Sequence, residues 1–287
     1  MKKLINLKAI ATMVTLLFSM TVIFTACGSS NESNSGKLQG KISVVGSTSV
    51  QPLAQELADD FNITETELLI DIQGVGSSAG IKAITDGTCD IGASSRELTK
   101  EEQAAGLTEK VIAIDGIAAI VNSSNSASDL TKEQLAKIFK GEIKNWKEVG
   151  GVDKEILVVS REAGSGTRGA FEELLKLQKK EGDKTISLVK SDALIAEGNG
   201  AVKANIASKD NAIGYISIGF VDKTVKALKI GGIEATEANV KAKTYSISRP
   251  FLMLTKGEMK PEVKAFMDYI LGDKGQAVVA KKYISVK

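Results

Sequence analysis

The pattern of apolar and polar positions along residues 41–93 predicts strands and helices that alternate along the chain. Short apolar runs bounded by glycine, serine or aspartate predict strands, and segments with apolar residues every three or four positions predict helices. In chain order these are a strand at 42–45, a helix at 50–61, a strand at 68–72, a helix at 79–84 and a strand at 90–93. Such alternation is typical of a sheet built from crossover units, so we expect an α/β fold that begins at Lys41.

The later part of the chain predicts a second lobe. An apolar run at 111–121, interrupted by Asp115 and Gly116, predicts a strand that crosses between lobes, and the run at 245–254 is long enough to return. The other expected elements are a helix at 130–139 capped by Ser128 and Asp129, a strand at 156–159, an amphipathic helix at 168–179, strands at 212–216 and 225–230, and helices at 261–271 and 274–281. We therefore expect two lobes joined by two crossing strands, with residues 41–115 and 248–287 in one lobe and 116–247 in the other.

The N-terminus has the pattern of a processing signal. Its basic leader contains Lys2, Lys3 and Lys8, and no charge occurs between positions 9 and 26. The small residues before Cys27 and the polar tract after it resemble a bacterial lipoprotein signal, in which Cys27 carries a lipid such as palmitate. Phe24 departs from that pattern, which usually has leucine there.

The N-terminal pattern predicts a location outside the cytoplasm. We expect residues 1–26 to be a lipoprotein signal peptide and residues 27–40 to be a flexible tether. The mature chain would then be lipid-anchored to the cell membrane through Cys27, on its outer side. The alternative is a membrane-spanning anchor with an incidental cysteine, which also places the rest of the chain outside.

Charge and composition exclude several classes of function. The leader holds three of the 37 basic residues and no acid, so 34 basic and 35 acidic residues remain, and we expect no nucleic-acid partner. The chain has no histidine, which removes histidine metal sites and histidine-assisted nucleophiles. We accordingly expect no catalytic residue, no metal and no cofactor. Cys89 has no intramolecular partner once Cys27 is acylated, and we expect a small buried side chain there.

Three Gly/Ser/Thr loops are the candidates for chemistry. They lie at residues 46–49, 74–80 and 163–168; each leads into a predicted helix, and two directly follow a predicted strand. A helix N-terminus leaves backbone N–H groups unpaired and carries about half a positive charge, so hydroxyls and glycines there let a small anion approach closely. Three such loops predict helix ends that converge on one oxyanion.

Two arginines are candidate charges for this anion site. Arg96 and Arg161 each lie within two residues of a serine at the end of a predicted strand, where an open α/β sheet presents its ligand crevice. A guanidinium fork can hold two oxygens of a tetrahedral anion. Ser165, Gly166 and Thr167 are interpreted as neutral donors. The alternatives are solvated arginines and an ordinary helix cap.

Other motif readings fit less well. Residues 74–79 match the dinucleotide spacing Gly-x-Gly-x-x-Gly/Ala, but the following strand ends in Ser94-Ser95-Arg96 and lacks the ribose-binding acid. The loop at 163–168 lacks both glycines of the hydrolase elbow, and no histidine could serve Ser165 as base. Trp146 is expected to pack between the lobes.

The combination of these loops resembles a known family. Residues 46–52, 74–80, 90–96 and 161–168 together resemble the phosphate-binding lipoproteins of bacterial phosphate-specific ABC transporters, and the similarity spans the mature chain. The resemblance implies a two-lobed periplasmic-binding-protein fold of type II that closes on one phosphate. It also implies ABC permease subunits with a cytoplasmic ATPase as partners.

The resemblance also implies which residues bind phosphate. Thr48 and Ser49 would supply the first helix end and Ser77 the second, and Arg161 with residues 165–167 would come from the other lobe. Some family members carry an aspartate that accepts the phosphate proton, and Ser95 stands at that position here, followed by Arg96. Asp115, at the expected crossing, is the candidate replacement, with hydroxyl acceptors as the alternative.

We therefore expect an extracytoplasmic solute-binding lipoprotein that captures inorganic phosphate between two lobes and delivers it to an ABC importer. A phosphomonoesterase-like enzyme with the same cradle is one alternative. A binding protein for another oxyanion, such as sulfate or molybdate, and a phosphate sensor without a transport partner are the others.

Overall fold

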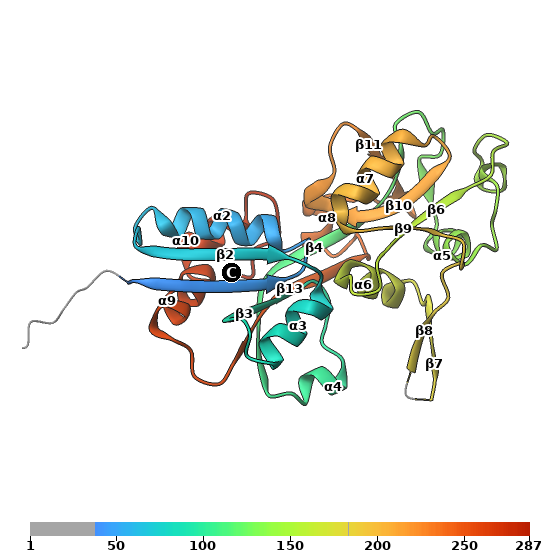
Figure 1. Cartoon of the computed structure of the whole chain (residues 1–287). Helices are drawn as coiled ribbons and strands as arrows, with labels where there is room; N and C mark the ends of the chain where they lie inside the picture. Colours follow the sequence, from blue (N-terminus) through green and yellow to red (C-terminus); the bar gives the residue numbers. More distant parts are fainter. Residues whose placement is uncertain (1–37, 183) are drawn as a thin grey trace, which may run out of the picture. The chain divides into compact units, whose positions relative to one another are not determined.

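The structure is a computed structural model that describes residues 38–182 and 184–287. The expected signal peptide, Cys27 and the expected tether up to residue 37 lie outside the described residues. The described chain combines helices and strands, which confirms the α/β expectation (Figure 1).

The first part of the chain forms most of one lobe. Its elements are β1 (Gly40–Gly46), α2 (Gln51–Asn62), β2 (Leu68–Gly74), α3 (Ser77–Thr85), β3 (Ile91–Ser94), α4 (Lys100–Gln103) and β4 (Leu107–Asn122). The last elements of the chain, β13 (Ser248–Lys256), α9 (Pro261–Leu271) and α10 (Asp273–Val279), return to it. The strands and helices predicted for this lobe are confirmed. The structure adds the short helix α4, which the apolar pattern did not predict.

Residues between these two parts form a second lobe. Its strands are β5 (Asp129–Leu130), β6 (Leu157–Arg161), β7 (Gln178–Glu181), β8 (Lys184–Ser187), β9 (Leu194–Ala196), β10 (Ala212–Ser217), β11 (Val225–Ala227) and β12 (Lys229–Ile230). Its helices are α5 (Lys132–Lys140), η1 (Trp146–Val149), α6 (Gly166–Leu174), α7 (Gly198–Ser208), η2 (Ile218–Phe220) and α8 (Glu237–Lys241).

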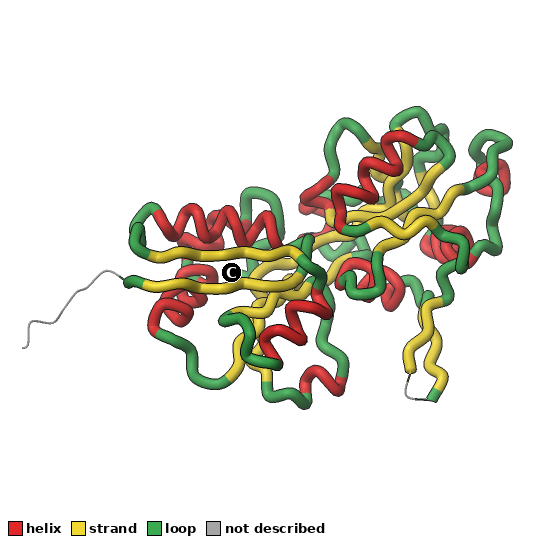
Figure 2. The backbone as a smooth tube through the Cα atoms, viewed as in Figure 1, coloured by secondary structure: helices red, strands yellow, loops and turns green. Residues whose placement is uncertain are grey.

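The long strand β4 connects the two lobes. Along its first part it pairs antiparallel with β13, down to the pair Gly116–Ser248, and from Ile117 onward it pairs with β10 instead. The strand order of the main sheet in the described residues is β2-β1-β3-β13-β4-β10-β6-β9, with β11 also on β4. Figure 2 shows these strands running through both lobes between helices. The two crossing strands are β4 and the start of β13, as expected.

The lobe that contains β1, called lobe 1 here, is a sheet with helices on both faces. Alternate residues of β13 illustrate this, because Phe251 and Met253 join the core beneath α2, α9 and α10, whereas Leu252 and Leu254 pack with α3. Successive side chains of a strand point to opposite faces, so a strand covered on both sides is apolar throughout.

The other lobe, called lobe 2, has its own core of residues between Ile117 and Ile247. Trp146 is fully buried in it, and its indole N–H donates to the carbonyl of Asn211 at 2.9 Å. The expectation that Trp146 packs between the lobes was therefore wrong. A large aromatic ring gains most from burial inside a core, and here the ring of Trp146 anchors the segment before β6 to that core.

Two predicted helices of lobe 2 have different limits. The helix α5 begins after Thr131, whose side chain accepts from the backbone N–H of Gln134 in a capping box. Ser128 and Asp129 do not cap this helix as predicted, because Asp129 is the first residue of the short strand β5 and Ser128 directly precedes it. The helix α6 ends at Leu174, and the next residues turn into the hairpin of β7 and β8. Lys176 has a positive φ of 55° at this point, which a continuing helix does not allow.

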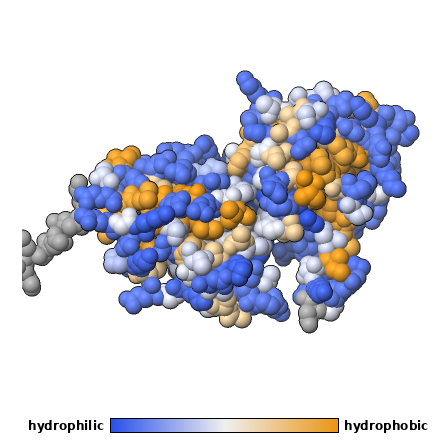
Figure 3. Space-filling view, viewed as in Figure 1, coloured by the Kyte–Doolittle hydropathy of each residue, from blue (hydrophilic) through white to orange (hydrophobic). Residues whose placement is uncertain are grey.

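The surface of the described chain is mixed in character. Hydrophilic residues cover much of the face drawn in Figure 3, with hydrophobic areas between them. The large apolar side chains that are exposed are Ile63, Leu69, Val75, Val111, Val152, Leu194, Ile195 and Val286. In residues 38–182 and 184–287, no helix is sufficiently long and apolar to span a bilayer.

Aromatic packing behind α6 holds the start of that helix in place, and we expect its loss to destabilise the protein. Phe171 stacks on Tyr215 at 3.9 Å between ring centroids and meets Phe139 edge-on at 4.8 Å. Phe171→Ala should lower the free energy of unfolding by about 3–5 kcal/mol, measured by urea denaturation followed by circular dichroism. Glu173→Gln, on the exposed face of the same helix, is the control, and equal stability of the two variants would contradict the packing argument.

Candidate functional site

Three strands of lobe 1 deliver serine-rich loops to one edge of the sheet. The strands β1, β2 and β3 are parallel, and in their register Gly46 at the end of β1 lies beside Gly74 and Ala93. The carboxyl ends of parallel strands are where α/β sheets bind ligands. The loops that follow them carry Ser47 to Ser49, Ser77 and Ser95 to this edge.

Glycines are required where these loops pack against each other. A Cβ on Gly80 would lie 2.4 Å from the carbonyl oxygen of Val45, so only glycine lets α3 approach β1 this closely. A Cβ on Gly166 would lie 2.1 Å from Ser77 Oγ and 2.7 Å from Ser95 Oγ. The first turn of α6, from lobe 2, therefore rests directly on two hydroxyls of lobe 1.

Lobe 2 contributes a strand end and a helix start. The strand β6 ends at Arg161, and α6 begins at Gly166 after Ser165, whose side chain accepts from the backbone N–H of Arg168 at 3.2 Å. Arg168 Nη1 in turn donates to the carbonyl of Arg161 at 2.9 Å, which ties the helix to the strand end. The third loop thus leads into a helix, as the sequence predicts, and Ser165 caps that helix, which was the alternative interpretation of this residue.

Hydrogen bonds join the two lobes at this place. Ser49 Oγ and Thr167 Oγ1 lie 2.9 Å apart, and Arg161 Nη2 donates to Thr48 Oγ1 at 3.0 Å. A backbone bond from Ser78 N to the carbonyl of Gly164 at 3.2 Å adds a third link. The structure therefore brings loops that are far apart in the sequence into one cluster.

The lobe 1 side of the cluster is a chain of hydroxyls. Ser47 Oγ donates to Ser95 Oγ at 2.8 Å, and Ser95 Oγ lies 3.4 Å from Ser77 Oγ. Ser77 Oγ also accepts from the backbone N–H of Ser95 at 3.1 Å. Each hydroxyl both donates and accepts, so such a group can serve a protonated or an unprotonated ligand oxygen.

The guanidinium of Arg161 lies inside this cluster. The side chain is 1% exposed; its Nε and Nη2 donate to the carboxylate of Glu162 at 2.8 and 2.7 Å. Burial acts to raise the pKa of Glu162, but the hydrogen bonds and the charge of Arg161, together with hydrogen bonds from the backbone N–H groups of Glu162 and Gly198, lower the pKa overall. The third nitrogen, Arg161 Nη1, is buried and has no hydrogen-bond partner among the described residues. Such a donor is costly unless a ligand accepts from it.

The structure does not bring Arg96 into the cluster. Its Nη1 and Nη2 donate to the two carboxylate oxygens of Glu102 at 2.7 and 2.8 Å, and Nη2 also donates to Ser78 Oγ at 3.2 Å. Its Cδ would lie 2.9 Å from a Cβ on Gly169, so the side chain packs against α6 at the rim. A direct contact of Arg96 with an anion stays a prediction.

Asp115 reaches the cluster only through another residue. Its Oδ1 accepts from Ser217 Oγ at 2.8 Å, and its Oδ2 accepts from Arg249 Nη2 at 3.0 Å. Burial raises the pKa of Asp115 to about 6, against the attraction of Arg249, which lowers it. Arg249 Nη2 also donates to Ser49 Oγ at 3.2 Å. The role of Asp115 as a proton acceptor for the ligand is therefore still a prediction.

Sequence reasoning missed several members of the cluster. Ser47 lies in the first loop beside Thr48 and Ser49, and the sequence does not show which of these hydroxyls point toward Ser95. Asn199, which donates to Ser49 Oγ at 3.0 Å, lies on α7, a helix with no clear apolar stripe. Arg249 was noted only as part of a crossing strand, although a charged residue at the start of a buried strand is itself a signal.

Comparison with known proteins identifies the family. A model described as a PBP superfamily domain matches residues 31–274. The phosphate-binding protein PstS of Bacillus subtilis is 32% identical over 267 residues, covering 89% of this chain and 86% of that protein. The chain belongs to the PBP superfamily, among its PstS-type phosphate-binding proteins.

Solved structures of this family share the fold. A substrate-binding protein from Clostridium perfringens, crystallised with bound phosphate, is 44% identical with a TM-score of 0.81, covering 86% of this chain and 100% of that chain. An ABC-type phosphate transport receptor from Vibrio cholerae is 40% identical with a TM-score of 0.73 and the same coverage. The expected two-lobed type II periplasmic-binding-protein fold is confirmed.

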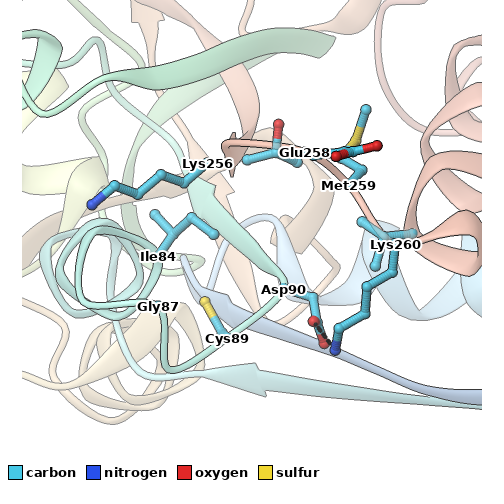
Figure 4. Close-up of a pocket in the computed structure, with 10 residues that line it drawn as sticks. Ile84, Gly87, Cys89, Asp90, Lys256, Glu258, Met259 and Lys260 are labelled. Atoms are coloured by element: carbon cyan, nitrogen blue, oxygen red, sulfur yellow. Dashed lines mark hydrogen bonds and ion pairs between the residues drawn. The ribbon is translucent and has the colours of Figure 1, made fainter.

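A separate pocket lies in lobe 1, away from this cluster (Figure 4). Its volume is about 220 Å³, and its lining combines the end of α3 with the segment that follows β13. Lys260 Nζ pairs with Asp90 Oδ1 at 2.8 Å, and Lys256 Nζ donates to the carbonyl of Thr85 at 2.6 Å. Its two lysines and Asp90 are therefore paired within the protein, whereas Arg161 of the interlobe cluster keeps a buried nitrogen without a partner in residues 38–182 and 184–287.

Cys89, on the wall of that pocket, is buried as expected, and its reactivity can be tested. Burial raises the pKa of the thiol to about 11, so little thiolate exists at neutral pH. We expect alkylation of Cys89 by iodoacetamide to be slow in the folded protein at pH 8. As the pH is raised toward that pKa, the rate should increase about tenfold for each pH unit, because it follows the fraction of thiolate. Mass spectrometry of the Cys89 peptide measures the rate, with urea-unfolded protein as control; equal rates folded and unfolded would contradict the burial.

Proposed function

We propose that this protein captures inorganic phosphate in the interlobe cluster and delivers it to an ABC importer. The observation that carries the proposal is the unpartnered Nη1 of Arg161, buried among hydroxyls from both lobes. Membership of the PstS-type proteins supports the same ligand. The family members are solute-binding proteins and not enzymes.

The cluster has the donors that a phosphate dianion needs. Arg161 offers positive charge, while Thr48, Ser49, Ser77 and residues 165–167 offer hydroxyls and helix N-termini without added charge. The pairing of Arg161 with Glu162 makes the buried pair nearly neutral before the anion binds. Binding then depends on directed hydrogen bonds, which favours a tetrahedral oxyanion of matching size over other anions.

The cluster also gives a route for closure on the ligand. Its members come from both lobes, and the lobes are joined by β4 and β13, which can change angle as crossing strands. A ligand that accepts hydrogen bonds from Ser77 and Arg161 at once stabilises the closed arrangement. A permease that recognises the closed lobes would then receive loaded protein.

The first experimental test removes the charge of the cluster. Arg161→Ala should weaken phosphate binding by more than about tenfold, because loss of a buried charge-assisted donor typically costs 2–5 kcal/mol. Calorimetric titration of phosphate and of sulfate into wild type and variant measures this, with circular dichroism to verify folding.

The control is Lys154→Gln, which breaks an exposed ion pair with Asp210 on the surface of lobe 2 and should bind as wild type does. Unchanged affinity in a folded Arg161→Ala variant would remove Arg161 from the site. A preference of the wild type for sulfate would favour the other-oxyanion alternative, and phosphate-ester hydrolysis with added metal would favour the enzyme.

We further propose that the mature protein is attached to the outer face of the cell membrane by lipid on Cys27. The small residues before Cys27 and the polar tract that follows it support this proposal. The near-neutral charge of the mature chain provides no electrostatic attachment to anionic lipid, so retention requires an apolar anchor, either the lipid on Cys27 or a membrane-spanning N-terminal segment.

Cys27→Ser should shift the protein from the membrane fraction to the soluble or secreted fraction. Cell fractionation with immunodetection measures the shift, and metabolic labelling with a clickable palmitate analogue reports acylation of wild type. Cys89→Ser is the matched control and should remain in the membrane fraction. A Cys27→Ser protein that stays in the membrane at full length would instead support a membrane-spanning anchor.

A further inference from the structure

A second arginine lies at the interlobe cluster, at the point where the two crossing strands meet. Arg249 is the second residue of β13, and in the antiparallel register it faces Asp115 of β4. Its side chain is 3% exposed or less, so the whole guanidinium is withdrawn from water. Burial of an arginine at a strand crossing requires partners for each of its donors.

The partners of Arg249 account for only part of the fork. Nε and Nη2 donate to Asp115 Oδ2 at 3.2 and 3.0 Å, and Nη2 also donates to Ser49 Oγ at 3.2 Å. The guanidinium carbon lies 5.5 Å from the ring centroid of Phe251. Nη1 is buried and has no partner among the described residues.

The same pattern occurs in Arg161. In both arginines Nε and Nη2 are held by a carboxylate, and in both Nη1 is left without an acceptor. Both also donate to hydroxyls of one loop, Arg161 to Thr48 and Arg249 to the adjacent Ser49. Both guanidiniums are buried, both leave Nη1 without an acceptor in the part of the chain that the structure describes, and both bind hydroxyls of adjacent residues. This arrangement points to one acceptor shared by the two Nη1 atoms.

Electrostatics agrees with this geometry. Burial lowers the pKa of Arg249, the attraction of Asp115 acts to raise it, and repulsion from Arg161 lowers it further. The two cations are therefore close enough to repel each other. An anion bound between them converts this repulsion into attraction for both.

We propose that Arg249 is a second anion-binding arginine of the interlobe site, which donates Nη1 to the oxyanion opposite Arg161. The inference rests on the proposed function and adds a ligand contact to it. Asp115 acts in this proposal as a positioning residue, because it holds the guanidinium of Arg249, and Ser217 in turn donates to Asp115. Since Arg249 belongs to a crossing strand, the bound anion contacts the connection between the lobes as well as the lobes themselves.

The competing explanation is that Arg249 and Asp115 form an ion pair of purely structural importance. Removing one partner of a buried pair is damaging whatever its role, so a single substitution cannot decide between the two. Replacing both partners by apolar residues of similar size usually preserves stability. The double variant therefore separates loss of a ligand contact from loss of the pair.

The test compares Arg249→Gln, Arg249→Lys and the double variant Asp115→Leu/Arg249→Met with wild type, as full-length chains in detergent. Binding of radiolabelled inorganic phosphate is measured by equilibrium dialysis, and thermal unfolding is followed by circular dichroism. We expect at least tenfold weaker binding in Arg249→Gln and in the double variant. Arg249→Lys, which keeps the charge but loses the fork, should be intermediate.

The control is Tyr245→Phe, which removes a hydrogen bond from the phenol to the carbonyl of Ile117 at the same crossing and should bind phosphate as wild type does. Recovery of wild-type affinity in the double variant would overturn the inference, because the pair would then be structural. Wild-type affinity in Arg249→Gln would also overturn it. Failure of the wild type itself to bind phosphate would refute the proposed function, a result distinct from either of these.

Discussion

The interlobe site depends on the burial of guanidinium charge away from water. Arg161 is 1% exposed, and a buried cation is tolerated only where carboxylates and hydroxyls replace its hydration. Glu162 and Thr48 do so from opposite lobes, so the solvation of one side chain already requires the lobes to meet. The close packing of Gly166 on Ser77 follows from the same requirement, because any larger residue would hold the lobes apart.

The cluster contains little net charge despite its arginines. Each guanidinium is paired with a carboxylate, and the remaining donors are neutral hydroxyls and backbone N–H groups. A site of this kind distinguishes ligands by the direction and number of hydrogen bonds more than by charge. It also lets a ligand leave, since release does not expose an uncompensated pair of cations. Both properties suit a protein that binds a ligand in order to transfer it.

The strand crossing is in direct contact with the hydroxyl cluster between the lobes. β4 changes its partner from β13 to β10 after Gly116, next to the buried pair of Asp115 and Arg249. This pair contacts the hydroxyl cluster through Ser49, so a hydrogen bond connects the crossing with the proposed phosphate site. In the proposed binding, a rearrangement at the cluster would reach the crossing over one or two side chains.

The sequence by itself determined the α/β class, the crossing strands and the three loops, because these follow from local periodicity and from residue types that are favoured at helix N-termini and tight turns. It did not reveal α7, whose apolar stripe is weak, or the early end of α6, where tertiary packing of the β7–β8 hairpin replaces helix. The sequence also did not predict which side chains pair with each other. The tertiary structure alone decided that Arg161 joins the cluster while Arg96 pairs with Glu102, and that Arg249 and Asn199 contact Ser49. The contacts of Arg161, Arg249 and Asn199 with Thr48 and Ser49 each span more than a hundred residues of chain, and local sequence carries no information about contacts of that kind. Arg96, in contrast, pairs with a residue six positions away.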